Sequence, residues 1–236
     1  GNHGRYPATS GYATIGVPGN SPFVITVGAL NSKSETTRTD EVAASYSSKG
    51  PTLIDQIVKP DLVAPGNLLI SLTHATATVA NRYPAIKIDA SYAKLSGTSM
   101  ATGVVSGAVA MMLQRDPTLT PNMVKARLMK TATKAFPAQT ITGVDALSNF
   151  SYTVHHDLFT VGAGALNIDA AMANTERATG VALSPRVQRD GTSVILNTQT
   201  VGGVNVIWGD AAFGPSGIWG SNVIWGTNVI WGTNVI

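Results

Sequence analysis

An α/β fold built around a parallel sheet is predicted for this chain, on the basis of two kinds of segment. Short, largely apolar runs at residues 23–30, 61–66 and 68–72 have the length and composition of buried strands. Residues 100–113 and 122–133 show the composition and spacing of helices. Because the predicted strands and helices alternate along the chain, we expect a parallel sheet packed against helices.

The strands are predicted from local composition. Residues 23–30 (FVITVGAL) are uncharged, rich in β-branched residues and followed by turn residues, which is typical of a strand buried on both faces. Residues 31–58 are polar, and two further apolar segments follow at 61–66 and 68–72. Residues 73–91 are expected to form an exposed loop insertion in which His74 is a surface residue.

Two helices are predicted after these strands. Residues 100–113 carry no charge, so a helix there should be apolar on every side and buried. Gly103 and Gly107 each lower helix propensity by about 1 kcal/mol, so we expect close approach of neighbouring backbone to compensate. The second helix starts at Thr120-Pro121, with threonine as N-cap and proline in the first helical position.

Ser99 is the candidate nucleophile. It lies between a turn of small residues, Gly97-Thr98, and the apolar helix. Small neighbours allow a substrate carbonyl to approach a serine hydroxyl. A helix start also offers unpaired N–H groups and a positive dipole end, which favour developing negative charge. The alternative is a buried helix that begins with an ordinary serine.

The whole string around Ser99 resembles the nucleophile motif of the subtilisin-like serine proteases, the subtilases. Four matches occur in the order of that family: Gly1-Asn2, Val27-Gly28-Ala29, KPDLVAPG at 59–66, and GTSMA at 97–101 with Val105 and Gly107. The resemblance covers about residues 1–174 and implies the carboxyl-side portion of a subtilisin-like parallel sheet with helices on both faces. The chain departs from the family at Gly103, where proline is usual.

The resemblance also implies roles for other residues. Asn2 would donate its side-chain amide to the oxyanion of a tetrahedral intermediate, with the backbone N–H of Ser99 as the second donor. Gly1 and His3 would lie beside the primary specificity pocket, so His3 is not expected to be the catalytic base. The loop Gly16-Val17-Pro18 resembles the lining of that pocket, including a Val17–Pro18 bond that is often cis in the family; an ordinary Pro-Gly turn is the alternative.

A serine protease also needs a base and a carboxylate that orients it. Subtilases carry both before the serine, and no His-Gly-Thr, Asp-Ser-Gly or Asp-Thr-Gly segment occurs in this sequence; Asp190-Gly191-Thr192 is predicted to be a hairpin turn. We therefore expect a fragment of a longer protein whose amino-side portion carries the aspartate and histidine, and no activity from the fragment alone. An α/β-hydrolase would instead use a histidine after the serine, His155 or His156.

Composition restricts cofactors and partners. The net charge is +3, and four basic residues on the second predicted helix (Lys125, Arg127, Lys130, Lys134) suggest a solvated face and not a nucleic-acid site, since no aromatics are interleaved. The chain has no cysteine, and the His155-His156 pair lacks metal-site spacing, so no metal site is predicted. No cofactor is required, although structural calcium is common in the family. No membrane span is expected.

The tail at residues 175–236 differs from the predicted catalytic portion at 1–174. It holds all four tryptophans (Trp208, Trp219, Trp225, Trp231), and the hexapeptide NVIWGT at 222–227 recurs at 228–233. In an extended chain this even period places the tryptophans on one face, which could bind sugars, another chain or a cell surface. The sequence thus predicts a secreted, extracellular endopeptidase acting on proteins or peptides. The alternative is a non-catalytic subtilase relative that serves in adhesion or assembly through these repeats.

Overall fold

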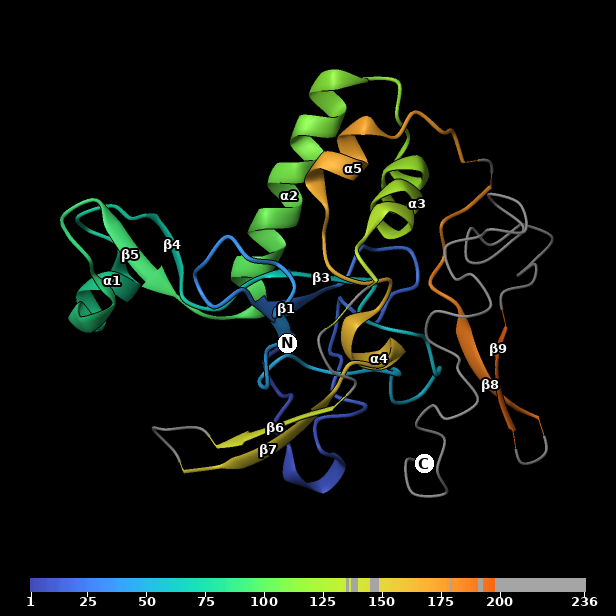
Figure 1. Ribbon diagram of the computed structural model, residues 1–236, viewed down its shortest axis with the longest axis horizontal. Coiled ribbons are helices and arrows are strands. Elements are labelled where there is room, and N and C mark those ends of the chain that lie inside the picture. Colours follow the sequence, from blue (N-terminus) through green and yellow to red (C-terminus); the bar gives the residue numbers. More distant parts are fainter. Residues whose placement is uncertain (135, 137–139, 145–148, 179, 191–192, 198–236) are drawn as a thin grey trace.

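The computed structural model describes residues 1–134, 136, 140–144, 149–178, 180–190 and 193–197 (Figure 1). The strands are β1 (Val27–Asn31), β2 (Val42–Ala43), β3 (Leu62–Pro65), β4 (Leu69–Leu72), β5 (Tyr92–Leu95), β6 (Thr140–Val144), β7 (Ser151–His155), β8 (Arg186–Asp190) and β9 (Ser193–Asn197). The α-helices are α1 (Thr78–Arg82), α2 (Thr98–Arg115), α3 (Pro121–Thr131), α4 (Leu158–Val161) and α5 (Ile168–Ala173). Two 3₁₀ turns occupy Pro7–Thr9 and Pro84–Ile86.

The central sheet is mixed, with strand order β2-β1-β3. Strands β1 and β3 are parallel, in the register Val27 to Leu62, whereas β2 is antiparallel to β1. The expected parallel sheet is therefore confirmed for β1 and β3 but not for β2. The segment after β1 turns back and pairs directly with it, as only an antiparallel strand can after a short connection. The remaining described strands pair as the hairpins β4–β5, β6–β7 and β8–β9.

Two predicted strands differ from the observed ones. Strand β1 begins at Val27 and not at residue 23, since Phe23 is 69% exposed and precedes the sheet. Residues 68–72 give β4, which pairs with β5 in a hairpin outside the central sheet and exposes Ile70 and Leu72. The segment between β4 and β5 is largely exposed, as predicted, but it contains α1 and a 3₁₀ turn where a loop was expected.

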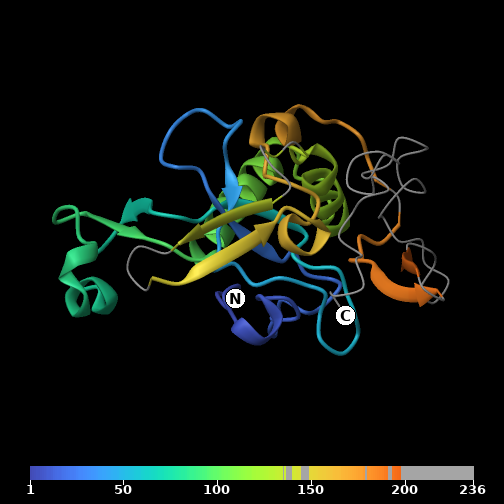
Figure 2. The ribbon, with the colours of Figure 1, turned by 60° about the horizontal axis from the view of Figure 1, so that its bottom comes forward.

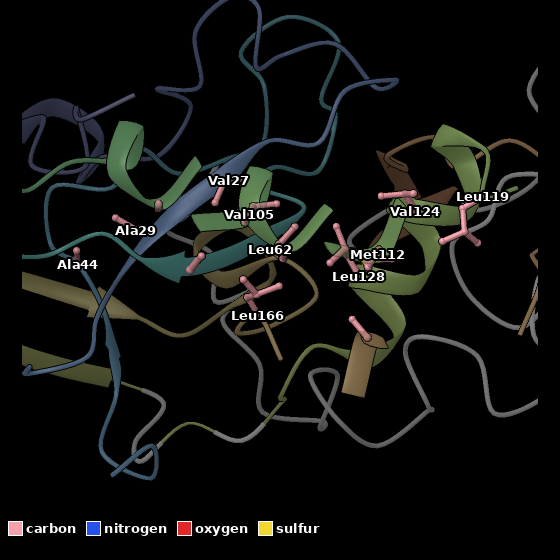
Figure 3. Packing of buried hydrophobic residues seen from close by; sticks show 14 residues of the cluster. Val27, Ala29, Ala44, Leu62, Val105, Met112, Leu119, Val124, Leu128 and Leu166 are labelled. Carbon is pink, nitrogen blue, oxygen red and sulfur yellow. The ribbon is translucent and has the colours of Figure 1, made fainter. Parts of the chain in front are cut away.

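Helices lie on both faces of the central sheet. On one face, Ala29, Leu62 and Ala64 pack with Ala101 and Val105 of α2 in the main apolar cluster (Figure 3). On the other face, Leu30 and Val63 pack with Val154 of β7 and Val161 of α4. Because successive residues of β1 and β3 enter different clusters, the sheet separates α2 from the β6–β7 hairpin.

Helix α2 is buried along one side only. Its buried positions are Thr98, Ala101, Val105, Ala108 and Met112, a helical stripe. Met111 and Leu113 are exposed, and a Cβ built on Gly103 or Gly107 would meet nothing within 4 Å. The predictions of a helix buried all round and of close backbone approach at these glycines are therefore wrong for the described residues.

Packing against the core continues beyond residue 174. Ala178 and Ala182 pack on Ala126 of α3, and the Val58 N–H donates to the Pro185 carbonyl at 2.9 Å. The division at 174 thus stays a prediction, and the described chain remains in contact with the core as far as Val187. Strands β8 and β9 pair on either side of residues 191–192, consistent with the predicted hairpin. The tryptophan repeats lie outside the described residues.

A buried cluster of charges joins these elements. The Asp61 side chain is fully buried and accepts from Lys59 Nζ at 2.8 Å, from the Thr26 N–H at 2.7 Å and from Ser184 Oγ at 2.5 Å. Lys125 Nζ lies 3.3 Å from Oδ1 of Asp61. The carboxylate therefore ties together β3, the segment before β1, α3 and the segment after α5.

The prediction of a solvated basic face is wrong for Lys125 and Arg127 of α3, and Lys134 lies beyond the end of that helix. Lys125 is 2% exposed and Arg127 6% exposed. Lys125 is held by Asp61 and by the backbone carbonyls of Pro22 and Val24, at 2.8 and 3.0 Å. Burial lowers the pKa of Lys125 to about 8, against the opposing effect of Asp61. A buried carboxylate elsewhere in the chain, which helical periodicity cannot reveal, explains the burial of this lysine.

We expect Asp61→Asn to lower the free energy of unfolding by about 3–5 kcal/mol, because it leaves two buried lysines without their carboxylate. Urea denaturation followed by circular dichroism measures the change. Asp40→Asn, which removes the exposed Lys33–Asp40 pair, is the matched control and should have a far smaller effect. Equal losses in the two variants would contradict this account of Asp61.

Lys134, just beyond α3, is a half-buried amine. Its Nζ donates to the carbonyls of Met129 and Ala163, at 2.8 and 2.6 Å. Burial lowers the pKa of Lys134 from 10.5 to about 7. Between these two pH values the unfolded chain binds more protons at this residue than the folded chain does, so its contribution to stability rises with pH.

The stability of the native chain relative to Lys134→Met should therefore increase as the pH is raised from about 7 towards 10.5. Urea denaturation of both proteins across this range gives the difference at each pH. Lys94→Met, which removes an exposed lysine of β5, controls for the loss of a positive charge. A difference that stays constant with pH would show that Lys134 is charged in the folded chain.

Candidate active site

Ser99 lies in the first turn of α2 with its side chain exposed. The turn before it is fixed by the Gly97 N–H, which donates to the Gly66 carbonyl at 2.8 Å. Gly97 is the N-cap and has φ +155°, a conformation that favours glycine. This hydrogen bond places the start of α2 next to Gly66, the residue that follows β3, and Ser99 lies in the first turn of the helix.

Asn2 meets the same turn from a segment 96 residues earlier in the chain. Its Oδ1 accepts from the Thr98 backbone N–H and from Thr98 Oγ1, both at 3.0 Å. A backbone N–H can only donate, so the atom that faces it must be the oxygen, and Nδ2 occupies the other side of the amide. A Cβ on Gly97 would lie 3.2 Å from Asn2 Nδ2, so the amide lies close to the turn.

Two hydrogen-bond donors are left without a protein acceptor at this turn, as far as the described residues go. One is Asn2 Nδ2, and the other is the backbone N–H of Ser99. The first N–H groups of a helix have no intrahelical partner, which explains the second. Two free donors beside an exposed hydroxyl are the arrangement that stabilises an oxyanion.

Residues 45–48 hold the Asn2 segment in place. The Ser48 N–H donates to the Gly1 carbonyl at 2.9 Å, and the His3 N–H donates to Ser48 Oγ at 3.0 Å. Tyr46 connects this segment to the nucleophile turn, because its hydroxyl donates to the Gly66 carbonyl at 2.9 Å. Burial raises the pKa of Tyr46 to about 12, so this hydroxyl keeps its proton at neutral pH.

Tyr46 and Gly66 are supporting residues that the sequence analysis missed. The KPDLVAPG string ending at Gly66 was recognised only as a family match, not for its contact with the Ser99 turn. A Cβ on Gly66 would lie 2.8 Å from the Gly97 carbonyl oxygen and 3.0 Å from Ala101 Cβ, so only glycine fits. The tight spacing of strand β3 and helix α2 depends on this position.

The predicted substrate loop at Gly16-Val17-Pro18 is exposed. Val17 is 85% exposed, its peptide bond to Pro18 is cis, and a Cβ on Gly16 would meet nothing within 4 Å. The Thr26 hydroxyl donates to the Gly19 carbonyl at 2.6 Å and anchors the loop at the segment before β1. No hydrogen bond within the described residues joins this loop to Asn2 or Ser99.

The histidines of the described chain do not meet Ser99. His156 Nε2 accepts from the Ala43 N–H at 3.1 Å, and its ring lies 4.8 Å from that of Phe136. His155 Nδ1 pairs with Thr140 Oγ1 at 2.9 Å across the β6–β7 hairpin. Both histidines belong to the part of the chain at β7, which packs on the face of the central sheet opposite α2. The structure therefore gives no support to the α/β-hydrolase alternative. The His3 backbone N–H donates to Ser48 Oγ, and His74 Nδ1 pairs with Thr76 Oγ1 at 2.8 Å.

Within the described residues, no group of three or more histidine, aspartate or glutamate side chains could hold a metal ion. Asp157, next to His156, instead accepts the Phe159 and Thr160 N–H groups at 2.9 Å each and so caps α4. Burial raises the pKa of this carboxyl. Among all the described residues, no helix combines the length and the apolar composition that a membrane span requires.

The chain belongs to the subtilase family, whose model matches residues 1–164. It is 42% identical over 120 residues to "Serine protease AprX" of Bacillus subtilis (strain 168), covering 51% of this chain and 27% of that protein. It is 35% identical over 133 residues to "Subtilisin E" of the same strain, covering 56% of this chain and 27% of that protein. The chain therefore spans about a quarter of the length of these two relatives.

Two solved structures are similar to part of the chain. Fervidolysin from Fervidobacterium pennivorans, described as a keratinolytic enzyme related to subtilisin, matches with a TM-score of 0.47 and 21% identity, over 80% of this chain and 27% of that chain. The Clostridium perfringens CspB protease matches with a TM-score of 0.46 and 28% identity, over 68% of this chain and 28% of that chain.

Gly97→Ala should destabilise the chain by about 1–3 kcal/mol, because alanine would be strained at this φ and its Cβ would press on the Asn2 amide. Gly107→Ala is the matched control: it lies on the open side of α2 and should stabilise the chain by up to about 1 kcal/mol. Chemical denaturation of both variants measures the two changes. Opposite signs are expected, and a stabilising Gly97→Ala would contradict the description of the turn.

Proposed function

We propose that this chain supplies the nucleophile half of a subtilisin-like serine endopeptidase. The Ser99 hydroxyl attacks a peptide carbonyl, the amine departs as an acyl-enzyme forms, and water then hydrolyses the acyl-enzyme. The observation that carries the proposal is the meeting of Asn2 with the Ser99 turn across 96 residues of sequence. Membership of the subtilase family supports the same reaction.

The oxyanion of the tetrahedral intermediate is bound by Asn2 Nδ2 and by the Ser99 N–H. Asn2 accepts two hydrogen bonds from Thr98 through Oδ1, so its amide is already oriented before a substrate arrives. A donor that is fixed in advance needs no reorganisation when negative charge develops. The positive end of the α2 dipole adds to this stabilisation.

The base and its orienting carboxylate come, in this proposal, from an amino-side portion outside these 236 residues. This follows from the positions of His155 and His156 on the other side of the sheet, and from the small share of its relatives that the chain covers. The isolated chain is then catalytically silent. No cofactor takes part in the reaction, and any structural calcium has no assigned ligands in this chain.

The substrate is a protein or peptide. Gly1, His3 and the loop Gly16-Val17-Pro18 contribute to its binding, with the glycines leaving room for a substrate side chain. The enzyme acts outside the cell, as a secreted protein. The adhesion or assembly alternative rests on the tryptophan repeats, which lie outside the described residues, so no structural observation favours it.

The test is a polypeptide in which the 236-residue chain follows the amino-side portion encoded upstream of it. Ser99→Ala should abolish peptide hydrolysis and labelling by a fluorophosphonate. Asn2→Leu should lower kcat by about 10²–10³, the loss that removal of such a donor causes in a subtilisin, with little change in KM. Ser106→Ala, on the exposed side of α2, is the control and should leave kcat unchanged.

Two results would contradict the proposal in different ways. Hydrolysis that survives Ser99→Ala would show that another residue is the nucleophile. Casein hydrolysis by the isolated 236-residue chain, with labelling at Ser99, would show that the base lies within this chain.

A further inference from the structure

A polar cavity lies at the carboxyl end of α2, the end away from Ser99. It has a volume of about 340 Å³ and is bounded by the ends of α2 and α5 and by α3, which pack side by side (Figures 1 and 2). The α-helical rise of about 1.5 Å per residue puts Arg115 about 24 Å from Ser99 along the helix. Its lining residues are Met112, Arg115, Asp116, Arg127, Ala171, Met172, Asn174, Thr175 and Arg177.

The charges around this cavity do not balance. Three arginines face a single carboxylate, that of Asp116. Arg177 Nη2 already donates to Asp116 Oδ2 at 2.8 Å and to Thr118 Oγ1 at 2.7 Å. No ion pair within the described residues joins Arg115 or Arg127 to a carboxylate. Asp116 and Glu176 act on Arg127 electrostatically, but their carboxylates are paired with Arg177 and Lys130.

Arg127 is more informative than Arg115. It is 6% exposed, and its Nη2 donates to the Glu176 backbone carbonyl at 3.0 Å. Its Nε is buried and has no hydrogen-bond partner among the described residues. A buried donor without an acceptor costs about 1–3 kcal/mol, so the folded chain is missing an acceptor at this point. Burial also lowers the pKa of Arg127, against the opposing effect of Asp116.

We propose that this cavity binds a small oxyanion, through Arg127 and Arg115. Carboxylate and phosphate groups share the required chemistry, because their oxygens match the planar guanidinium and accept two of its N–H groups at once. The Asn174 side chain supplies further polar lining, and Met112, Ala171 and Met172 form an apolar wall that suits the carbon atoms next to a carboxylate.

The proposed ligand would also hold the chain after α5 in place. Arg127 of α3 donates to the backbone carbonyl of Glu176 in this segment. Arg177 of the same segment donates to the Asp116 carboxylate at the end of α2. The positive charge of Arg177 lowers the pKa of Arg127, so the two guanidiniums repel each other. An anion at the cavity would offset this repulsion and stabilise the docking of residues 175–178 against α2 and α3.

The test titrates the 236-residue chain with inorganic phosphate, with N-acetylleucine and with its neutral amide, N-acetylleucinamide, at constant ionic strength. Binding is followed by calorimetry and by the ¹⁵N–¹H signal of the Arg127 side-chain Nε. Phosphate, N-acetylleucine or both should bind, shift this signal and raise Tm, and their relative affinities identify the preferred oxyanion. The neutral amide should do none of these.

Arg115→Gln should weaken binding by about tenfold or more, equivalent to at least about 1.4 kcal/mol. Arg127→Gln should abolish binding. If the Arg127→Gln variant does not fold, Arg115→Gln, a change at an exposed residue, still tests the proposal. Arg82→Gln, an equal loss of charge on α1, is the control and should bind normally. The proposal is wrong if neither anion shifts the Arg127 signal, or if Arg115→Gln and Arg82→Gln bind equally well. Because Ser99 lies at the other end of α2, failure here leaves the proposed peptidase reaction untouched.

Discussion

The hydrogen bond from the Thr98 N–H to Asn2 Oδ1 is the interaction on which the candidate site depends. It uses one of the unpaired N–H groups that every helix start carries, and it thereby fixes an amide from the beginning of the chain at the amino end of α2. The geometry around it leaves little freedom, since Gly66 and Gly97 admit no larger side chain. The position of Ser99 follows from these close contacts more than from the helix itself.

Sequence alone predicted the parts of the molecule whose signals are local. The string around Ser99, the cap at Thr120 and the apolar core of β3 were recognisable because each depends on a few adjacent residues. The pairing of β2 with β1 was not, because two residues of an unremarkable polar segment form that strand. The candidate site residues came from the family motif and stay a prediction. The contact of Tyr46 with Gly66 could not be predicted, since it spans 20 positions of sequence.

The errors on α3 have one physical origin. Helical spacing indicates which residues share a face, but it does not say whether that face meets water or a buried partner. Lys125 is buried because Asp61 compensates its charge, and Asp61 lies just before β3, 64 positions earlier. Arg127 is buried with no ion pair to a carboxylate among the described residues. The unbalanced charge at the end of α2 therefore becomes visible only when the burial of each arginine is known.

The uncharged outer side of α2 has a consequence for work with this chain in solution. A Cβ at Gly103 or Gly107 would meet nothing within 4 Å, so this side of the helix packs against no described side chain. Because the sequence contains no cysteine, a single cysteine at Gly107 would carry a probe on this side of α2 without disturbing the packing of the core.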